Sequence, residues 1–173
     1  MIIRPTWCPG CASKLRTRRL GPRNEPHPHC PACGFVHYDN PVPCVGVLVM
    51  HDGRLLLGKR RQNPFRGWWN VLGGFVEGRE HPEETAVREV LEEAGVEVRL
   101  EGLQGIYIDR YGKTPEITMN LVYRGTLISG EPQAGDDIAA LRWFAPHEID
   151  VSRIAFACGR TAVTALLADW PRD

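Results

Sequence analysis

Residues 74–96 read GFVEGREHPEETAVREVLEEAGV and carry the strongest structural signal in this sequence. Pro82 suits the first turn of a helix, and Gly95 can adopt the left-handed conformation that ends one. The acidic residues around Pro82 also favour a helix start, because the helix dipole stabilises negative charge there. The stretch therefore predicts a glycine-rich loop followed by a helix over residues 82–94.

Three carboxylates share one face of this predicted helix. Glu89, Glu92 and Glu93 stand at positions i, i+3 and i+4, which are neighbours on a helix surface. Like charges so placed repel each other by roughly a few tenths of a kcal/mol per pair. A hard divalent cation would remove this repulsion, so we predict a metal site on this face. A solvated acidic face is the structural alternative.

The loop and the helix together follow one spaced pattern, G-x5-E-x7-R-E-U-x-E-E-x-G-U, in which U is an aliphatic residue. The residues at its fixed positions are Gly74, Glu80, Arg88, Glu89, Val90, Glu92, Glu93, Gly95 and Val96. This pattern resembles the complete signature of the Nudix hydrolases. The resemblance implies an α/β fold, an α/β/α sandwich with a mixed sheet, and hydrolysis of a pyrophosphate bond with Mg²⁺ or Mn²⁺.

The resemblance also implies roles for single residues. The expected metal ligands and catalytic residues are the carbonyl of Gly73 and the carboxylates of Glu89, Glu92 and Glu93. Glu80 and Arg88 are expected to form an ion pair that connects the loop to the helix and orients these carboxylates. The general base is expected to be Glu89 or an acidic residue of a later loop.

Two flanking segments extend the resemblance. Residues 69–74, WNVLGG, correspond to the W-x-L-P-G-G phrase that is common in the family, with Leu72 where proline is usual. Many relatives place a further acidic ligand or base in the region of the polar loop at 129–137. Asp136 and Asp137 are therefore candidates for that role, and a solvated turn is the alternative.

A basic cluster lies just before the glycine-rich loop. Arg60 and Arg66 stand close in sequence to Trp68, so this segment can hold a phosphate by charge and a planar ring by stacking. We predict that these three residues bind the substrate. Solvated cations beside core tryptophans are the alternative.

Four cysteines near the amino terminus form two C-x2-C pairs, Cys8 with Cys11 and Cys30 with Cys33. Two tight turns let four thiolates converge, and this spacing is typical of a structural Zn²⁺ site. Redox or incidental thiols are the alternative. We therefore predict a small β-rich zinc ribbon over residues 1–40 and a Nudix hydrolase domain over residues 41–173.

A zinc ribbon ahead of this signature resembles two groups of Nudix enzymes, the NADH pyrophosphatases and the bacterial and plastid FAD and ADP-ribose pyrophosphatases. Residues 35–41, FVHYDNP, resemble the second group, and residues 104–109, QGIYID, lack the Ser-Gln-Pro-Trp phrase of the first. ADP-ribose or FAD is therefore the first prediction for the substrate. The alternatives are NADH or NAD hydrolysis, removal of a nucleotide cap from RNA, and a nucleotide-sensing or RNA-binding protein without activity.

The formal net charge of zero hides an asymmetry. Residues 1–40 carry six Lys and Arg against two acidic residues, and the remainder carries fifteen against nineteen. RNA is therefore a second option as a partner of the ribbon, ranked below stabilisation and homodimer formation. No apolar run reaches membrane-spanning length and the start lacks a signal peptide's hydrophobic region, which predicts no membrane partner and a cytoplasmic location.

The remaining chain alternates β-rich runs with turns. Strands are expected at residues 42–50, 55–59, 96–101, 103–109, 117–127 and 140–144, and a closing helix is expected at residues 153–170. A helix flanked by groups of strands is consistent with the sandwich.

Overall fold

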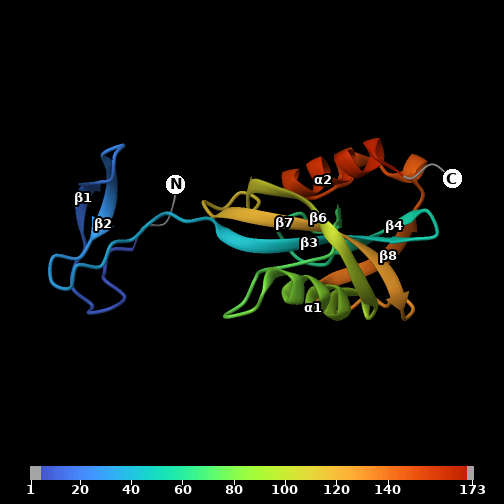
Figure 1. The fold of residues 1–173 in the computed structure, drawn as a ribbon, viewed down its shortest axis with the longest axis horizontal. Coiled ribbons are helices and arrows are strands. Elements are labelled where there is room, and N and C mark those ends of the chain that lie inside the picture. Colours follow the sequence, from blue (N-terminus) through green and yellow to red (C-terminus); the bar gives the residue numbers. More distant parts are fainter. Residues whose placement is uncertain (1–4, 171–173) are drawn as a thin grey trace. The chain divides into compact units, whose positions relative to one another are not determined.

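The computed structural model describes residues 5–170, and these fall into two compact units that divide between Pro41 and Val42. The amino-terminal unit contains an antiparallel hairpin of two strands, β1 (Arg16–Leu20) and β2 (Glu25–His29), drawn in blue in Figure 1. Isolated bridges extend it, pairing Trp7 with Lys14 and His29 with Val36. This unit is small and β-rich, as the sequence predicts.

The sheet unit, residues 42–170, is built on a mixed sheet of six strands. They are β3 (Val42–His51), β4 (Arg54–Arg60), β5 (Trp69–Asn70), β6 (Glu97–Arg110), β7 (Ile117–Ser129) and β8 (Ile138–Phe144). Their order is β5-β4-β3-β7-β6, with β8 paired to β4. β3 and β7 run parallel, while the other pairs are antiparallel.

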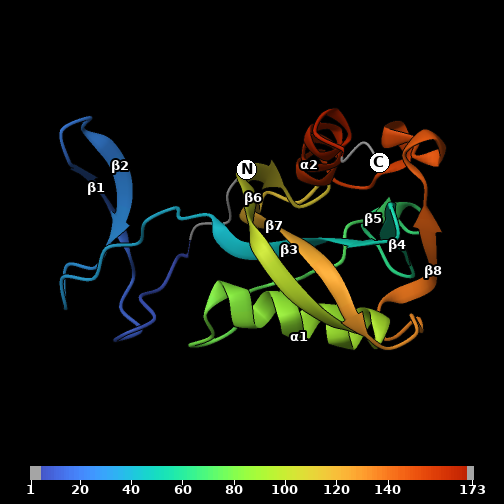
Figure 2. The same ribbon diagram turned by 45° about the vertical axis from the view of Figure 1, so that its right-hand side comes forward.

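Two helices cover opposite faces of this sheet, as Figure 2 shows: α1 (Pro82–Ala94) and α2 (Ala157–Ala168). Successive side chains of a strand point to opposite faces. On β3, Val47 therefore packs in the same cluster as Val90 of α1. Its neighbour Leu48 packs on the other face, with Val163 of α2. These three layers confirm the predicted α/β/α sandwich.

Local signals set both ends of α1. Gly95 follows the helix with a φ of 67°, in the left-handed region that the sequence predicts. At the start, the His81 side chain accepts from the N–H of Glu83, and the Glu84 carboxylate accepts from the N–H of His81 at 3.0 Å. This capping box was not predicted. It holds the first turn, and hence the helix that carries the acidic residues.

The segment after α1 is one strand, whereas the sequence predicts two. β6 runs through residues 97–110, and its pairing with β7 shifts register around Gly102 and around Gly105. The glycines therefore mark bulges within a continuous strand.

The closing helix begins at Ala157, later than predicted. Ala155 donates its N–H to the carbonyl of Trp69 at 2.8 Å, so the preceding segment still pairs with β5. Two short 3-10 turns lie before it, Pro146–Glu148 and Val151–Arg153. Among residues 5–170, no helix combines the length and the apolar character needed to cross a membrane.

Candidate active site

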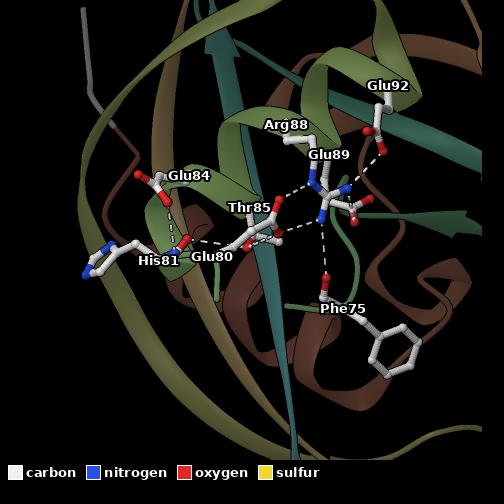
Figure 3. A network of polar contacts seen from close by, with 8 residues as sticks. All are labelled: Phe75, Glu80, His81, Glu84, Thr85, Arg88, Glu89 and Glu92. Carbon is white, nitrogen blue, oxygen red and sulfur yellow. Dashed lines mark hydrogen bonds and ion pairs between the residues drawn. The ribbon is translucent and has the colours of Figure 1, made fainter. Parts of the chain in front are cut away.

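Arg88 of α1 gathers the acidic side chains of the loop and the helix, as Figure 3 shows. Its Nε and Nη2 donate to the two carboxylate oxygens of Glu80 at 2.8 and 3.0 Å. Its Nη1 donates to Glu89 at 3.0 Å and to Glu92 at 2.9 Å. The ion pair expected between Glu80 and Arg88 is therefore present, and its bidentate geometry fixes the guanidinium plane. Arg88 in turn orients Glu89 and Glu92.

Glu80 is held firmly in its charged form. The hydrogen bonds from Arg88, with a further one from the Thr85 hydroxyl at 2.9 Å, lower the pKa of Glu80 to about 2. The pair therefore persists through the whole neutral range of pH.

We predict that Glu80→Gln reduces hydrolytic activity by about tenfold, because partners that orient ligand side chains typically contribute at this level. Glutamine keeps one acceptor oxygen but loses the charge and one of the two bonds to Arg88. The matched control is Glu83→Gln on the exposed first turn of α1, which should change activity by less than about twofold. Equal losses in steady-state kcat/KM for both variants would contradict the orienting role.

Glu93 and Glu89 are withdrawn from water beside the glycine-rich loop. Glu93 is only 9% exposed, and its Oε2 accepts the N–H of Gly73 at 2.8 Å. Burial raises the pKa of Glu93 to about 8. Burial also raises the pKa of Glu89, although the charge of Arg88 opposes this shift. Two neighbouring carboxylates in this environment are unfavourable when both are charged.

The donor atoms around these carboxylates fit a divalent cation. Mg²⁺ and Mn²⁺ prefer carboxylate and carbonyl oxygens, and a bound cation favours the charged forms that burial disfavours. The backbone also approaches closely: a Cβ placed on Gly74 would lie 2.5 Å from Oε1 of Glu89. At Gly73, whose φ is 142°, a Cβ would lie 2.2 Å from the carbonyl oxygen of Val45. The contact at Gly73 is with backbone and requires glycine, whereas a side chain at Gly74 would have to displace the Glu89 carboxylate.

A cavity of about 250 Å³ opens beside the carboxylates. Glu89, Glu93 and Gly73 line it, together with Arg60 and Asp137, which reach it from β4 and from the turn before β8. The charges of Arg60 and Asp137 act on Glu93 in opposite directions, the first lowering and the second raising its pKa. Residues far apart in the chain therefore share one charged site.

Aromatic rings line another part of this cavity. Tyr111 and Phe156 are stacked, with centroids 5.5 Å apart and planes 21° apart, and Phe75 contacts Tyr111 at 5.5 Å. The Arg60 guanidinium lies over the Phe156 ring at 5.0 Å. A planar apolar surface with a cation against it suits a ligand that has both a ring and a phosphate. These aromatic residues were not predicted.

Four of the residues predicted to bind the catalytic metal or the substrate lie outside the lining of the cavity: Arg66, Trp68, Glu92 and Asp136. The Glu92 side chain is 45% exposed and contacts Arg88. Trp68 packs against Phe65, with ring centroids 5.8 Å apart. Asp136 has a φ of 33° in the turn before β8.

We predict that Gly74→Ala displaces Glu89 and lowers activity by about 10- to 100-fold, because the new methyl group would overlap the carboxylate. The overlap should also reduce the free energy of unfolding by about 1–3 kcal/mol. Kinetics with saturating Mg²⁺ and chemical denaturation measure the two effects. Full activity in a folded Gly74→Ala protein would show that the position of Glu89 does not matter.

The four cysteines of the amino-terminal unit converge. Their Sγ atoms all lie within 4.8 Å of one another, and separations of 3.5 Å join Cys8 to Cys33 and Cys11 to Cys30. Four sulfurs bound at about 2.3 Å to one tetrahedral Zn²⁺ ion lie about 3.8 Å apart. The arrangement therefore fits a four-cysteine metal site.

Equivalent turns carry the two cysteine pairs. The N–H of Ala12 donates to the carbonyl of Cys8 at 2.9 Å, and the N–H of Gly34 donates to the carbonyl of Cys30 at 3.0 Å. Ala12 and Gly34 both have positive φ, 56° and 81°. The matching turns bring the two pairs of sulfurs to one point.

The family model for the NUDIX domain matches residues 40–163. The chain is 36% identical over 107 residues to a protein named ADP-ribose pyrophosphatase in Methanocaldococcus jannaschii, a match covering 62% of this chain and 63% of that protein. It is 33% identical over 141 residues to a protein named NAD-capped RNA hydrolase NudC in Stutzerimonas stutzeri, and this match covers 80% of this chain and 47% of that protein. The chain thus spans about half to two thirds of the length of these curated relatives.

Solved structures share the fold. A crystal structure described as a NUDIX hydrolase from Nitrosomonas europaea aligns with a TM-score of 0.83 and 27% identity, over 95% of this chain and 92% of that one. A crystal structure described as a MutT NUDIX hydrolase from Burkholderia pseudomallei aligns with a TM-score of 0.67 and 29% identity, over 73% of this chain and 98% of that one. The matched range contains the glycine-rich loop, α1 and all six strands of the sheet unit, and the chain belongs to the Nudix family.

Proposed function

We propose that the protein hydrolyses the pyrophosphate bond of a nucleoside diphosphate derivative, with ADP-ribose or FAD as the preferred substrate. The observation that carries this proposal is the cavity that joins the buried carboxylates Glu89 and Glu93 to an aromatic wall and to Arg60. In this proposal residues 41–173 are the Nudix hydrolase domain. Residues 1–40 are a zinc ribbon whose Zn²⁺ is structural, because four protein ligands leave no position for substrate.

The proposed metal ligands are the Gly73 carbonyl and the carboxylates of Glu89, Glu92 and Glu93. Asp137 is the favoured further ligand, since it lines the cavity whereas Asp136 does not. When bound, a Mg²⁺ or Mn²⁺ ion neutralises charge on the pyrophosphate and lowers the pKa of a coordinated water. Glu92 is included because the sequence pattern contains it. In the structure its carboxylate accepts a hydrogen bond from Arg88.

Glu89 is the proposed general base. Its carboxylate lines the cavity that would hold the metal-coordinated water. Arg88 holds Oε1 of Glu89 at 3.0 Å and so fixes the direction of the carboxylate. Glu93 is held separately by the N–H of Gly73, which keeps the two carboxylates in fixed positions.

Arg60 and the aromatic wall are proposed to bind the two kinds of group in the substrate. The Nε of Arg60 donates to the carbonyl of Pro64 at 2.7 Å, which positions the guanidinium against Phe156. A phosphate beside Arg60 would lie at the carboxylate side of the cavity, and a ring would lie against Phe156 and Tyr111. ADP-ribose and FAD offer both groups.

One of the two alternatives has specific support. The relative named NAD-capped RNA hydrolase NudC supports hydrolysis of NADH, NAD or a nucleotide cap on RNA. A nucleotide-sensing or RNA-binding protein without activity is the non-enzymatic alternative, which predicts loss of a carboxylate from the pattern. All three carboxylates are retained.

The proposal is tested by measuring the release of phosphate esters, in the presence of Mg²⁺, from ADP-ribose, FAD, NADH, NAD and dGTP. We expect kcat/KM for ADP-ribose or FAD to exceed that for the other compounds by at least about tenfold. A preference for NADH or NAD would favour the first alternative. Binding of ADP-ribose by calorimetry without turnover of any compound would favour the non-enzymatic alternative.

A further inference from the structure

A row of cations runs along one face of the hairpin in the amino-terminal unit. Arg16 and Arg18 are separated by Thr17 on β1, so their side chains point to the same face. Lys14 stands two residues earlier, and all three cations are exposed. Alternate residues of a strand lie about 7 Å apart. This spacing is close to that of successive phosphates on an extended nucleic-acid strand.

Exposed aromatic side chains border this row. Trp7 is 60% exposed and pairs directly opposite Lys14. Tyr38 is 53% exposed and packs on the ring of His27 at 5.0 Å, and His27 pairs directly opposite Arg18. Directly opposite residues of an antiparallel pair share a face. Trp7, Lys14, Arg16, Arg18 and Tyr38 together form what we call the cationic face.

Each acidic side chain described in this unit has a neighbour within 4 Å. Glu25 lies 3.6 Å from Arg23, and Asp39 lies 3.4 Å from His37. A Zn²⁺ ion on four thiolates carries a net formal charge of about −2. The local row of cations, rather than the net charge of the unit, therefore favours an anionic ligand.

We propose that the cationic face binds single-stranded RNA. The three cations would contact phosphates, and Trp7 and Tyr38 would stack on bases. Proteins that bind single strands combine these same two elements, a positive track along the backbone and aromatic platforms. A duplex keeps its bases stacked inside and offers only its phosphates and grooves to such a face. This binding is separate from the hydrolysis proposed for the sheet unit.

Fluorescence anisotropy with the full chain and a labelled oligouridylate of about 12 nucleotides tests the proposal. The oligonucleotide ends in a 5′-hydroxyl, so it contains no pyrophosphate bond. We expect Arg16→Glu/Arg18→Glu to weaken binding at least about tenfold at about 50 mM salt. The slope of log K against log salt should become shallower by about 1.4, the value for two lost phosphate contacts.

A matched double variant distinguishes an effect of the cationic face on RNA affinity from an effect of the net charge. Arg19→Glu/Arg23→Glu makes the same change in charge outside the cationic face. Arg19 points away from this face and donates to the Asn24 carbonyl at 2.7 Å, and Arg23 lies in the turn between β1 and β2. This control should lose much less affinity. Trp7→Ala should weaken binding about fivefold or more with an unchanged salt slope, because it removes stacking. Zinc content of one ion per chain establishes that each variant is folded.

Several outcomes would overturn the proposal. These are no binding of the oligonucleotide at low salt, equal losses in the two double variants, and tighter binding of a duplex of the same length. Binding to vesicles of anionic phospholipid without binding to RNA would identify a membrane surface instead. A Trp7→Ala protein that changes from dimer to monomer with unchanged RNA affinity would assign the face to self-association.

Discussion

Glu93→Gln is expected to reduce hydrolysis of the preferred substrate by about 10³-fold with little loss of stability. Glutamine has nearly the same shape, and its oxygen can still accept the N–H of Gly73. It removes a negative charge that the proposed metal site requires. Burial already disfavours that charge, since the pKa of Glu93 is raised to about 8. Without divalent cations the variant should therefore unfold at the same or a higher denaturant concentration than the wild type.

Glu93→Gln is compared with the wild type in both activity and stability, with a control variant. Steady-state kinetics over a range of Mg²⁺ concentrations measure the loss of activity, and urea denaturation in the absence of Mg²⁺ measures stability. Glu83→Gln removes the same charge from an exposed position of α1 and should leave both values nearly unchanged. A Glu93→Gln protein with at least half of the wild-type kcat/KM would remove Glu93 from the chemistry.

Cys30→Ser is expected to abolish stoichiometric zinc binding and to unfold the amino-terminal unit. Cys30 is fully buried, and its Sγ is one of four sulfurs that lie within 4.8 Å of one another. Structural Zn²⁺ sites contribute roughly 10–16 kcal/mol of apparent binding free energy to small domains. Within residues 5–41 the structure has one two-stranded hairpin, and only Cys8 and Cys30 are buried, so these residues form no apolar core that could replace that contribution.

Hydrolysis of a small nucleotide by the sheet unit should persist in this variant, because the proposed zinc is closed to substrate. Zinc quantification and proteolysis of the amino-terminal unit report its loss of structure. Cys158→Ser, a matched change in the sheet unit, should keep one zinc per chain. Loss of both zinc and hydrolysis after Cys30→Ser would assign the zinc a role in catalysis or in the stability of the whole chain.

The sequence predicts those features of the structure whose determinants are local. Pro82 and Gly95 correctly predict the ends of α1, because cap residues act within one turn. The spacing of Glu89, Glu92 and Glu93 predicts one shared face, and two of them, Glu89 and Glu93, line the cavity while Glu92 does not. The cysteine pairs likewise converge, because each pair lies on its own tight turn.

Features that depend on contacts between distant segments could not be predicted from the sequence. Tyr111 follows β6 and Phe156 precedes α2, and only the tertiary fold stacks their rings in the cavity. The start of α2 was predicted too early because Ala155 pairs with Trp69, far away in sequence. The choice between Asp136 and Asp137 could not be made from composition, since neighbouring residues of a turn point in different directions. A tertiary contact leaves little trace in local propensity.

Metal-dependent hydrolysis through Glu93 can be tested by measuring AMP release from ADP-ribose, with and without Mg²⁺, for the wild type and Glu93→Gln in parallel. We expect AMP and ribose 5-phosphate from the wild type with Mg²⁺, no release after chelation, recovery when Mg²⁺ is restored, and about 10³-fold slower release by Glu93→Gln. AMP release that persists in the presence of chelator, or that proceeds at the wild-type rate in Glu93→Gln, would contradict it.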